Sequence, residues 1–119
     1  MKKKIYYLAT CSTCQDIMSS LGINENSGFE LQDIRTQKIT EAQLDEMRAL
    51  AGSYEALFSR RALKYKELSL KDQKLTEADY KRYILEYDTF LKRPVVIWGD
   101  KIFIGGDKKT IAGLSAIMG

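Results

Sequence analysis

Residues 5–14 have the sequence IYYLATCSTC, in which an apolar run leads into a polar turn with two cysteines. The run from Ile5 to Ala9 contains β-forming residues, so it predicts a buried strand. Apolar residues then recur at helical spacing as far as Gly22, a residue typical of helix ends, so a helix is expected after the turn. The apolar stripe of that helix is formed by Ile17, Met18 and Leu21.

The two cysteines, Cys11 and Cys14, lie where this strand passes into this helix. Cys11 falls beside the unpaired backbone N–H groups and the positive dipole end of the helix, and both favour thiolate over thiol. We therefore expect the pKa of Cys11 to lie below the value of about 8.5 for a free thiol. Cys14 follows by about one helical turn, within reach of the first sulfur, where it can resolve a mixed disulfide.

A Cys-x-x-Cys pair after the first strand of a cytosolic α/β chain indicates a thioredoxin-like redox motif. Two alternatives remain open, namely inert packing residues and half of a zinc site completed by carboxylates or a second subunit. The chain has no His and no further Cys, so a Ser-His or Cys-His pair is excluded and no metal site is expected. A redox-active or regulatory thiol pair is the interpretation that we favour.

The chain after the first helix shows a second strand pattern over Phe29–Ile34. A capping box at Thr40 then predicts a helix that ends at Gly52. Short helices are expected over residues 54–70, and a longer amphipathic helix over residues 76–91.

The C-terminal part predicts a β-hairpin and a last helix. Pro94–Trp98 is an apolar strand with proline at its first position, and Gly99-Asp100 is a turn before the return strand Lys101–Ile104. Asp107 can cap the helix that follows. The order β-α-β-α, a helical stretch and then β-β-α predicts an α/β fold in which helices pack on a sheet.

The composition indicates a globular protein with one domain over residues 1–119, with 45% hydrophobic and 29% charged residues. The net charge of +3 is scattered, so no direct nucleic-acid partner is expected, and Lys2–Lys4 are predicted to be a solvated end. The first apolar run is shorter than the roughly seven to fifteen residues of a secretory signal core. No run approaches the eighteen or so residues of a membrane span. We therefore predict a cytoplasmic protein with no membrane partner.

Two places offer fixed positive charge to a thiolate enzyme with an anionic substrate. Arg60 and Arg61 lie in the middle of the chain, and Arg93 directly precedes Pro94, the single proline. Arginine suits this role because its planar guanidinium binds oxyanions through two hydrogen bonds and stays protonated. A solvated basic surface is the alternative for all three arginines. Pro94 fixes the chain direction at the start of its strand, and a cis bond is possible there.

Three segments together resemble the arsenate reductase (ArsC) family. They are the strand-turn-helix start with Cys11-Ser12-Thr13-Cys14, the segment LFSRRALKYKEL over residues 57–68, and the stretch from Arg93-Pro94 to Ile104-Gly105. This family includes glutaredoxin-type arsenate reductases, YffB-like relatives and Spx-type transcription regulators. The segments occur in the same order as in the family and span nearly the whole chain.

The resemblance implies a thioredoxin-like (glutaredoxin-type) mixed sheet flanked by helices, with a helical insertion at about residues 38–91. It implies that Cys11 is the nucleophile and that Arg93 is an active-site arginine beside a cis-proline, Pro94. The substrate-binding arginine of the middle segment falls on Arg60 or Arg61, and Arg61 matches the non-arsenate relatives better. No bound cofactor is implied, and glutathione or a thioredoxin is the expected reductant.

Two functions follow from the resemblance. The first is a thiol-disulfide reductase that acts on a small thiol or oxyanion substrate, with Cys11, Cys14 and Arg93 as catalytic residues. Arsenate itself is not the favoured substrate, because residues 104–107 lack the arginine that glutaredoxin-type arsenate reductases carry there, and Asp107 would repel an oxyanion. The alternative is an Spx-like regulator that binds RNA polymerase near Ala51–Ser53 and is switched by a Cys11–Cys14 disulfide.

Overall fold

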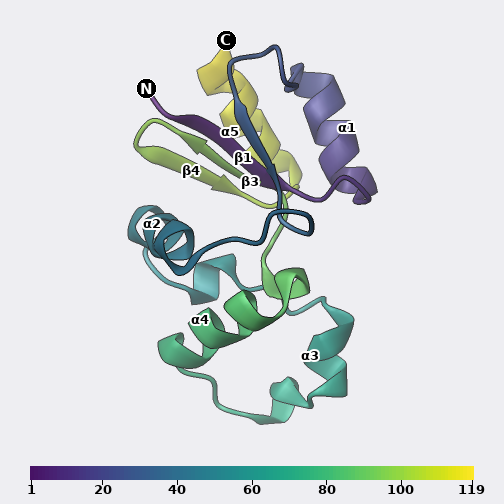
Figure 1. The fold of residues 1–119 in the computed structure, drawn as a ribbon, viewed down its shortest axis with the longest axis vertical. Coiled ribbons are helices and arrows are strands. Elements are labelled where there is room, and N and C mark those ends of the chain that lie inside the picture. The colour runs from purple at the N-terminus through teal and green to yellow at the C-terminus, as the bar shows by residue number, and fades with distance from the viewer. The chain divides into compact units, whose positions relative to one another are not determined.

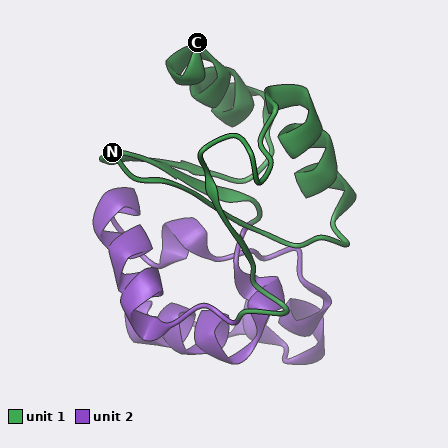
Figure 2. Ribbon diagram, turned by 45° about the horizontal axis from the view of Figure 1, so that its top comes forward, with its two compact units in different colours: residues 1–37, 93–119 green, residues 38–92 purple.

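The computed structural model describes all residues, 1–119, as two compact units (Figure 2). The sheet unit consists of Met1–Gln37 together with Arg93–Gly119. The helical unit consists of Lys38–Lys92 and is therefore inserted between the two segments of the sheet unit. None of the helices combines the length and the apolar character needed to cross a bilayer.

A four-stranded mixed sheet forms the centre of the sheet unit, with the strand order β2-β1-β3-β4 (Figure 1). Strand β1 runs parallel to β2, whereas β3 is antiparallel to both β1 and β4. The α/β class and the mixed sheet predicted from the sequence are confirmed. The strands are β1 (Lys3–Tyr7), β2 (Glu30–Asp33), β3 (Val95–Trp98) and β4 (Lys101–Ile104).

Helices α1 (Ser12–Leu21) and α5 (Lys108–Met118) pack against one face of this sheet. Alternate strand residues meet them, because side chains two apart point to the same face of a strand. Gly22 ends α1 at a φ of 68°, and Gly99 lies in the turn between β3 and β4 at a φ of 63°. The apolar cluster between the helices and the sheet contains Ile5, Ile23, Phe29, Val96 and Leu114.

The first strand differs from its prediction at both ends. It begins at Lys3 and ends at Tyr7, because a turn closed by Cys11 N–H donating to the Leu8 carbonyl follows it. Lys4 is buried and forms an ion pair with Glu30 on the neighbouring strand, so the prediction of a solvated lysine end was wrong at this position. The paired carboxylate is what makes the burial of this ammonium group tolerable.

The helical unit contains the short helices predicted for its middle part. Thr40 and Thr76 each form a complete capping box, with Gln43 and Asp79 respectively, at the starts of the two longer helices. The elements are α2 (Glu41–Ala51), α3 (Leu63–Glu67), α4 (Glu77–Glu86) and the 3-10 helices η1 (Glu55–Leu57), η2 (Leu70–Asp72) and η3 (Asp88–Phe90).

Helix α4 ends earlier than the apolar spacing predicts. It stops at Glu86 because Tyr87 adopts an extended conformation, and η3 then leads to Leu91. Leu91 forms an antiparallel bridge with Phe58, and Phe58 stacks on Phe90 at a centroid distance of 4.9 Å. Tyr80, Ile84 and Leu91 are buried, so the apolar side of this segment is directed inward, but its last part is not α-helical.

Candidate active site

The turn after β1 places Cys11 at the N-cap position of α1, as the sequence predicts. Cys11 has extended backbone angles, its N–H donates to the Leu8 carbonyl at 3.1 Å, and its own carbonyl accepts the Gln15 N–H at 3.0 Å. The side chain is partly exposed and forms no capping hydrogen bond. The sulfur therefore lies at the positive end of the helix, where it remains accessible to solvent.

The surroundings of Cys11 favour its ionised form. Burial by itself would raise the pKa of this thiol, but the backbone N–H and the thiol of Cys14 and the positive charge of Arg93 lower the pKa below its ordinary value. The low pKa predicted from the helix N-terminus is thus supported, and Arg93 contributes a charge from a segment about eighty residues along the chain, near the start of β3.

Cys14 is the complementary thiol of the pair. Its side chain is fully buried, and burial raises its pKa to about 11, with a further contribution from the neighbouring Cys11. Cys14 is therefore a protonated thiol at neutral pH, and it is a hydrogen-bonding neighbour of the Cys11 sulfur. Both cysteines are free thiols in this structure.

Arg93 lies near both cysteines in the sheet unit, and Pro94 follows it directly before β3. The Arg93–Pro94 peptide bond is cis, as the resemblance implies, and Pro94 is buried. Two nitrogens of the Arg93 guanidinium, Nε and Nη1, are buried without a hydrogen-bond partner. A buried N–H group without an acceptor is destabilising, so these two nitrogens favour an anionic group placed beside them.

The loop after β4 also reaches the cysteine motif. The Gly105 N–H donates to the Pro94 carbonyl at 2.9 Å. A Cβ atom on Gly106 would lie 2.6 Å from Thr13 Cγ2 and 3.1 Å from Ile17 Cδ1, so only glycine fits there without a shift. No local pattern in the sequence predicts this close approach, because Thr13 is distant from Gly106 in the chain.

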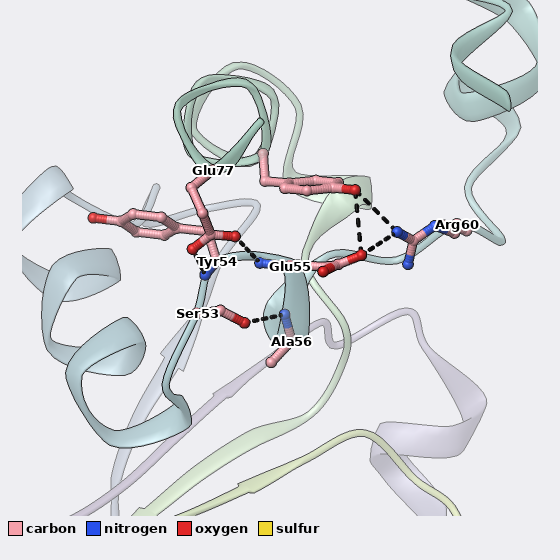
Figure 3. A network of polar contacts seen from close by, with 7 residues as sticks. Ser53, Tyr54, Glu55, Ala56, Arg60 and Glu77 are labelled. Carbon is pink, nitrogen blue, oxygen red and sulfur yellow. Dashed lines mark hydrogen bonds and ion pairs between the residues drawn. The ribbon is translucent and has the colours of Figure 1, made fainter. Parts of the chain in front are cut away.

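Arg60 belongs to a polar network inside the helical unit (Figure 3). Its Nη2 donates to Glu55 Oε2 at 2.7 Å and to the Tyr80 hydroxyl at 3.0 Å. Glu55 lies at the start of η1, where the Glu77 carboxylate accepts the N–H groups of Tyr54 and Glu55 at 2.7 and 3.0 Å. Arg60 is thus already engaged with a carboxylate of its own unit.

Arg61 is different from its neighbour. It is exposed and has no hydrogen bond or ion pair in the structure. Arg60 and Arg61 both lie in the helical unit, whereas Cys11, Cys14 and Arg93 lie together in the sheet unit. Of the two arginines that the sequence leaves as alternatives, Arg61 is the one whose guanidinium is available to a ligand.

Gly52, which the regulator hypothesis places near a polymerase contact, ends helix α2. Its φ is 96° and its N–H donates to the Arg48 carbonyl at 2.8 Å. This left-handed conformation favours glycine, so helix termination accounts for the residue.

Comparison with known proteins places the chain in a family. Residues 6–114 match the ArsC family. An arsenate reductase from Haemophilus influenzae is 28% identical over an alignment of 118 positions, which covers 90% of this chain and 93% of that protein.

Solved structures show the same fold. An arsenate reductase from Vibrio cholerae has a TM-score of 0.78 at 19% identity, covering 95% of this chain and 97% of that chain. An ArsC family related protein from Bacteroides fragilis also has a TM-score of 0.78, at 25% identity, covering 96% and 99% of the two chains. The thioredoxin-like fold predicted from the sequence is therefore confirmed.

The matched range, residues 6–114, contains both cysteines, the two mid-chain arginines, Arg93 and Pro94. The match covers far more than half of the chain and agrees with the fold of the sheet unit. This chain belongs to the ArsC family.

Proposed function

We propose that this protein is a thiol-dependent reductase that uses Cys11 as nucleophile and Cys14 as resolving thiol. The observation that carries the proposal is the opposite displacement of the two pKa values at one helix N-terminus, lowered for Cys11 and raised to about 11 for Cys14. A nucleophile must be a thiolate, whereas a resolving group kept as a thiol does not compete for the substrate.

In the first step the Cys11 thiolate attacks one sulfur of a small disulfide substrate. A Cys11–substrate disulfide forms, the substrate S–S bond breaks, and the other half of the substrate leaves as a thiolate. The lowered pKa of Cys11 and the partial exposure of its side chain both support its role as the attacking thiolate.

In the second step Cys14 loses its proton to the departing thiolate and attacks the Cys11 sulfur. The mixed disulfide breaks, the second half of the substrate is released as a thiol, and a Cys11–Cys14 disulfide forms. The substrate disulfide has then gained two electrons, and the cysteine pair has lost two. An external dithiol of the thioredoxin kind, or two molecules of glutathione, returns the pair to its reduced form.

The arginines hold the negative groups of the substrate in this proposal. Arg93 offers two buried nitrogens without partners, and its charge also stabilises the Cys11 thiolate. Arg61 offers an exposed guanidinium that no protein carboxylate neutralises, whereas Arg60 is held by Glu55. A guanidinium beside Cys11 in the sheet unit favours a disulfide substrate that carries carboxylates, such as oxidised glutathione.

Arsenate is a weaker candidate substrate, although relatives of this chain are arsenate reductases. Hydrogen bonding by Thr110 lowers the pKa of Asp107, so this carboxyl is ionised at neutral pH. Asp107 directly follows Gly106, which touches the first turn of α1 at Thr13. A fixed negative charge in this neighbourhood disfavours a multiply charged oxyanion more than it disfavours a neutral disulfide bond.

The test is a steady-state assay of the purified chain with oxidised glutathione and, separately, with arsenate. Oxidised glutathione is supplied with a thioredoxin system, because reduced glutathione as its reductant would give no net reaction, and arsenate is supplied with either reduced glutathione or a thioredoxin system. We expect disulfide reduction that Cys11→Ser abolishes, and a Cys14→Ser variant that accumulates the mixed disulfide, detectable by mass spectrometry. Ser12→Ala, a change of an exposed neighbour in the same turn, is the matched control and should leave turnover within about twofold.

Retained turnover in Cys11→Ser would rule out the proposed nucleophile. Faster turnover of arsenate than of the disulfide would assign the oxyanion as substrate instead. The RNA polymerase partner stays a prediction, and a pull-down of polymerase by oxidised but not reduced protein would support that alternative.

A further inference from the structure

The backbone of Ala9, two residues before Cys11, is held on both sides by side chains from two other elements of the sheet unit. Ala9 is exposed and lies inside the turn that Cys11 N–H closes onto the Leu8 carbonyl. Neither its N–H nor its C=O belongs to the ladder of β1 or to the helical hydrogen bonds of α1. Without other hydrogen bonds, the turn from Leu8 to Cys11 would be fixed only at its two ends.

Asp33 holds the N–H side of Ala9. Its Oδ2 accepts the Ala9 N–H at 3.3 Å, while its Oδ1 accepts the Arg35 N–H at 3.0 Å. The carboxylate is itself fixed, because Asp33 ends β2 and its carbonyl accepts the Gln37 N–H at 2.8 Å. The end of β2 is thereby connected to the turn that carries the candidate nucleophile.

Gln15 holds the carbonyl side of Ala9. Its Nε2 donates to the Ala9 carbonyl oxygen, and its own backbone N–H donates to the Cys11 carbonyl at 3.0 Å. Gln15 follows Cys14 in the first turn of α1, so this side chain connects the helix that positions the two sulfurs with the turn in front of it.

We propose that Asp33 and Gln15 are positioning residues that fix the Cys11 sulfur against the N-terminus of α1 by clamping the Ala9 backbone through its N–H and its carbonyl. This inference rests on the proposed role of Cys11 as the reactive thiolate. The stabilisation of that thiolate by the Cys14 N–H and by Arg93 depends on where the sulfur lies. When the turn is released, the sulfur samples positions away from both groups, and the thiolate loses part of its stabilisation.

The direction in which the Cys11 pKa changes in an Asp33 variant distinguishes a positioning role from a purely electrostatic one. Removing a negative charge near a thiolate would by itself make the thiolate easier to form. Releasing the clamp makes the thiolate harder to form. Asp33→Asn keeps the size of the side chain but replaces one of its two acceptor oxygens by an NH₂ group, so it loses one of the two backbone N–H partners.

The experiment measures the pH dependence of Cys11 alkylation by iodoacetamide in the full chain, with the modified residue assigned by mass spectrometry and folding checked by thermal unfolding. For Asp33→Asn and for Gln15→Leu we expect alkylation at pH 7 to slow by about threefold to tenfold and the titration midpoint to rise. Asp16→Asn, an exposed carboxylate on the residue after Gln15, controls for charge and should lower the midpoint slightly or leave it unchanged.

Gln73→Leu controls for the loss of a glutamine side-chain hydrogen bond, because Gln73 Nε2 donates to the Leu68 carbonyl at 3.3 Å in the helical unit. This variant should leave Cys11 alkylation unchanged. Folded Asp33→Asn and Gln15→Leu variants with the wild-type midpoint and rate would overturn the clamp. A wild-type Cys11 with an ordinary thiol midpoint would instead overturn the proposed function, so the two failures are distinguishable.

Discussion

Cys11 and Cys14 lie three residues apart at the start of α1, and the fold shifts their pKa values in opposite directions. The partly exposed sulfur is stabilised as a thiolate by N–H and guanidinium groups. The buried sulfur is kept as a thiol because it has no water around it. One helix terminus therefore favours a thiolate at Cys11 and a protonated thiol at Cys14.

The raised pKa of Cys14 predicts a loss of stability in alkali. Burial favours its neutral form, so this contribution is fully present below the ordinary thiol pKa of 9.0 and is lost as the pH rises toward about 11. The free energy of unfolding should fall over this interval with a slope of up to about 1.4 kcal/mol per pH unit from this group. Urea unfolding at several pH values measures it.

Lysine and tyrosine also titrate in this interval, so Cys14→Ala provides the comparison. The variant is less stable at every pH because it leaves a cavity, but its difference from wild type should shrink as the pH rises from 9 to 11. A difference that stays constant over the interval would contradict a buried neutral thiol. Cys11 acts in the opposite sense, since its lowered pKa adds stability as the pH rises through its folded value.

Removing the charge of Arg93 should make Cys11 a weaker acid. In Arg93→Gln the coulombic and hydrogen-bonding contributions of the guanidinium are lost, so the Cys11 pKa rises and alkylation at pH 7 slows by about threefold or more. Arg82→Gln, an exposed arginine paired with Asp79 in the helical unit, is the matched control. Equal alkylation rates for the two variants would remove Arg93 from the site.

Gly106 should resist replacement because of Thr13. A Cβ at 2.6 Å from Thr13 Cγ2 forces a backbone or side-chain shift, so Gly106→Ala should cost about 1–3 kcal/mol in thermal or chemical unfolding. Gly113→Ala in α5 is the control, because its Cβ meets Phe103 at an ordinary 3.4 Å, and this change should be neutral or stabilising.

A double variant makes the cause of this effect specific. Thr13→Ser removes the methyl group that clashes, so Thr13→Ser/Gly106→Ala should recover a good part of the stability lost in Gly106→Ala. Additive losses in the double variant would show that the cost has another origin.

The two adjacent arginines should behave differently. Arg61→Gln is expected to raise KM for oxidised glutathione, because it removes an exposed guanidinium with no protein partner. Arg60→Gln breaks contacts with Glu55 and Tyr80 that are partly exposed, so it should cost at most about 1 kcal/mol of stability and change KM little. The reverse pattern in steady-state kinetics would assign the substrate role to Arg60.

Local patterns in the sequence were sufficient for most elements of the fold. The capping box at Thr40, the helix start at Thr76, the turn at Gly99 and the helix end at Gly22 are each predicted boundaries that the structure confirms. These signals depend on residues within one turn of each other, so a single sequence carries them. The end of α4 could not be predicted, because the bridge of Leu91 with Phe58 is a contact between distant residues.

The candidate site was predictable only in part for the same reason. The cysteine pair between a strand and a helix is a local motif, and it led to Cys11 and Cys14. Asp33, Gln15 and Gly106 carry no local signal, because their partners are at Ala9 and Thr13 in other segments or on the far side of a turn. The choice between Arg60 and Arg61 likewise depended on Glu55, whose carboxylate is brought to Arg60 by the fold.

The central claim is tested most directly by the pH dependence of alkylation of the two cysteines in the native protein. Iodoacetamide at limiting concentration, with the site assigned by mass spectrometry, should modify Cys11 with a midpoint below the ordinary thiol value and leave Cys14 unmodified until the pH approaches 11. In urea both cysteines should react alike. Equal reactivity of the two thiols in the folded protein, or a Cys11 midpoint at or above the ordinary value, would contradict the account.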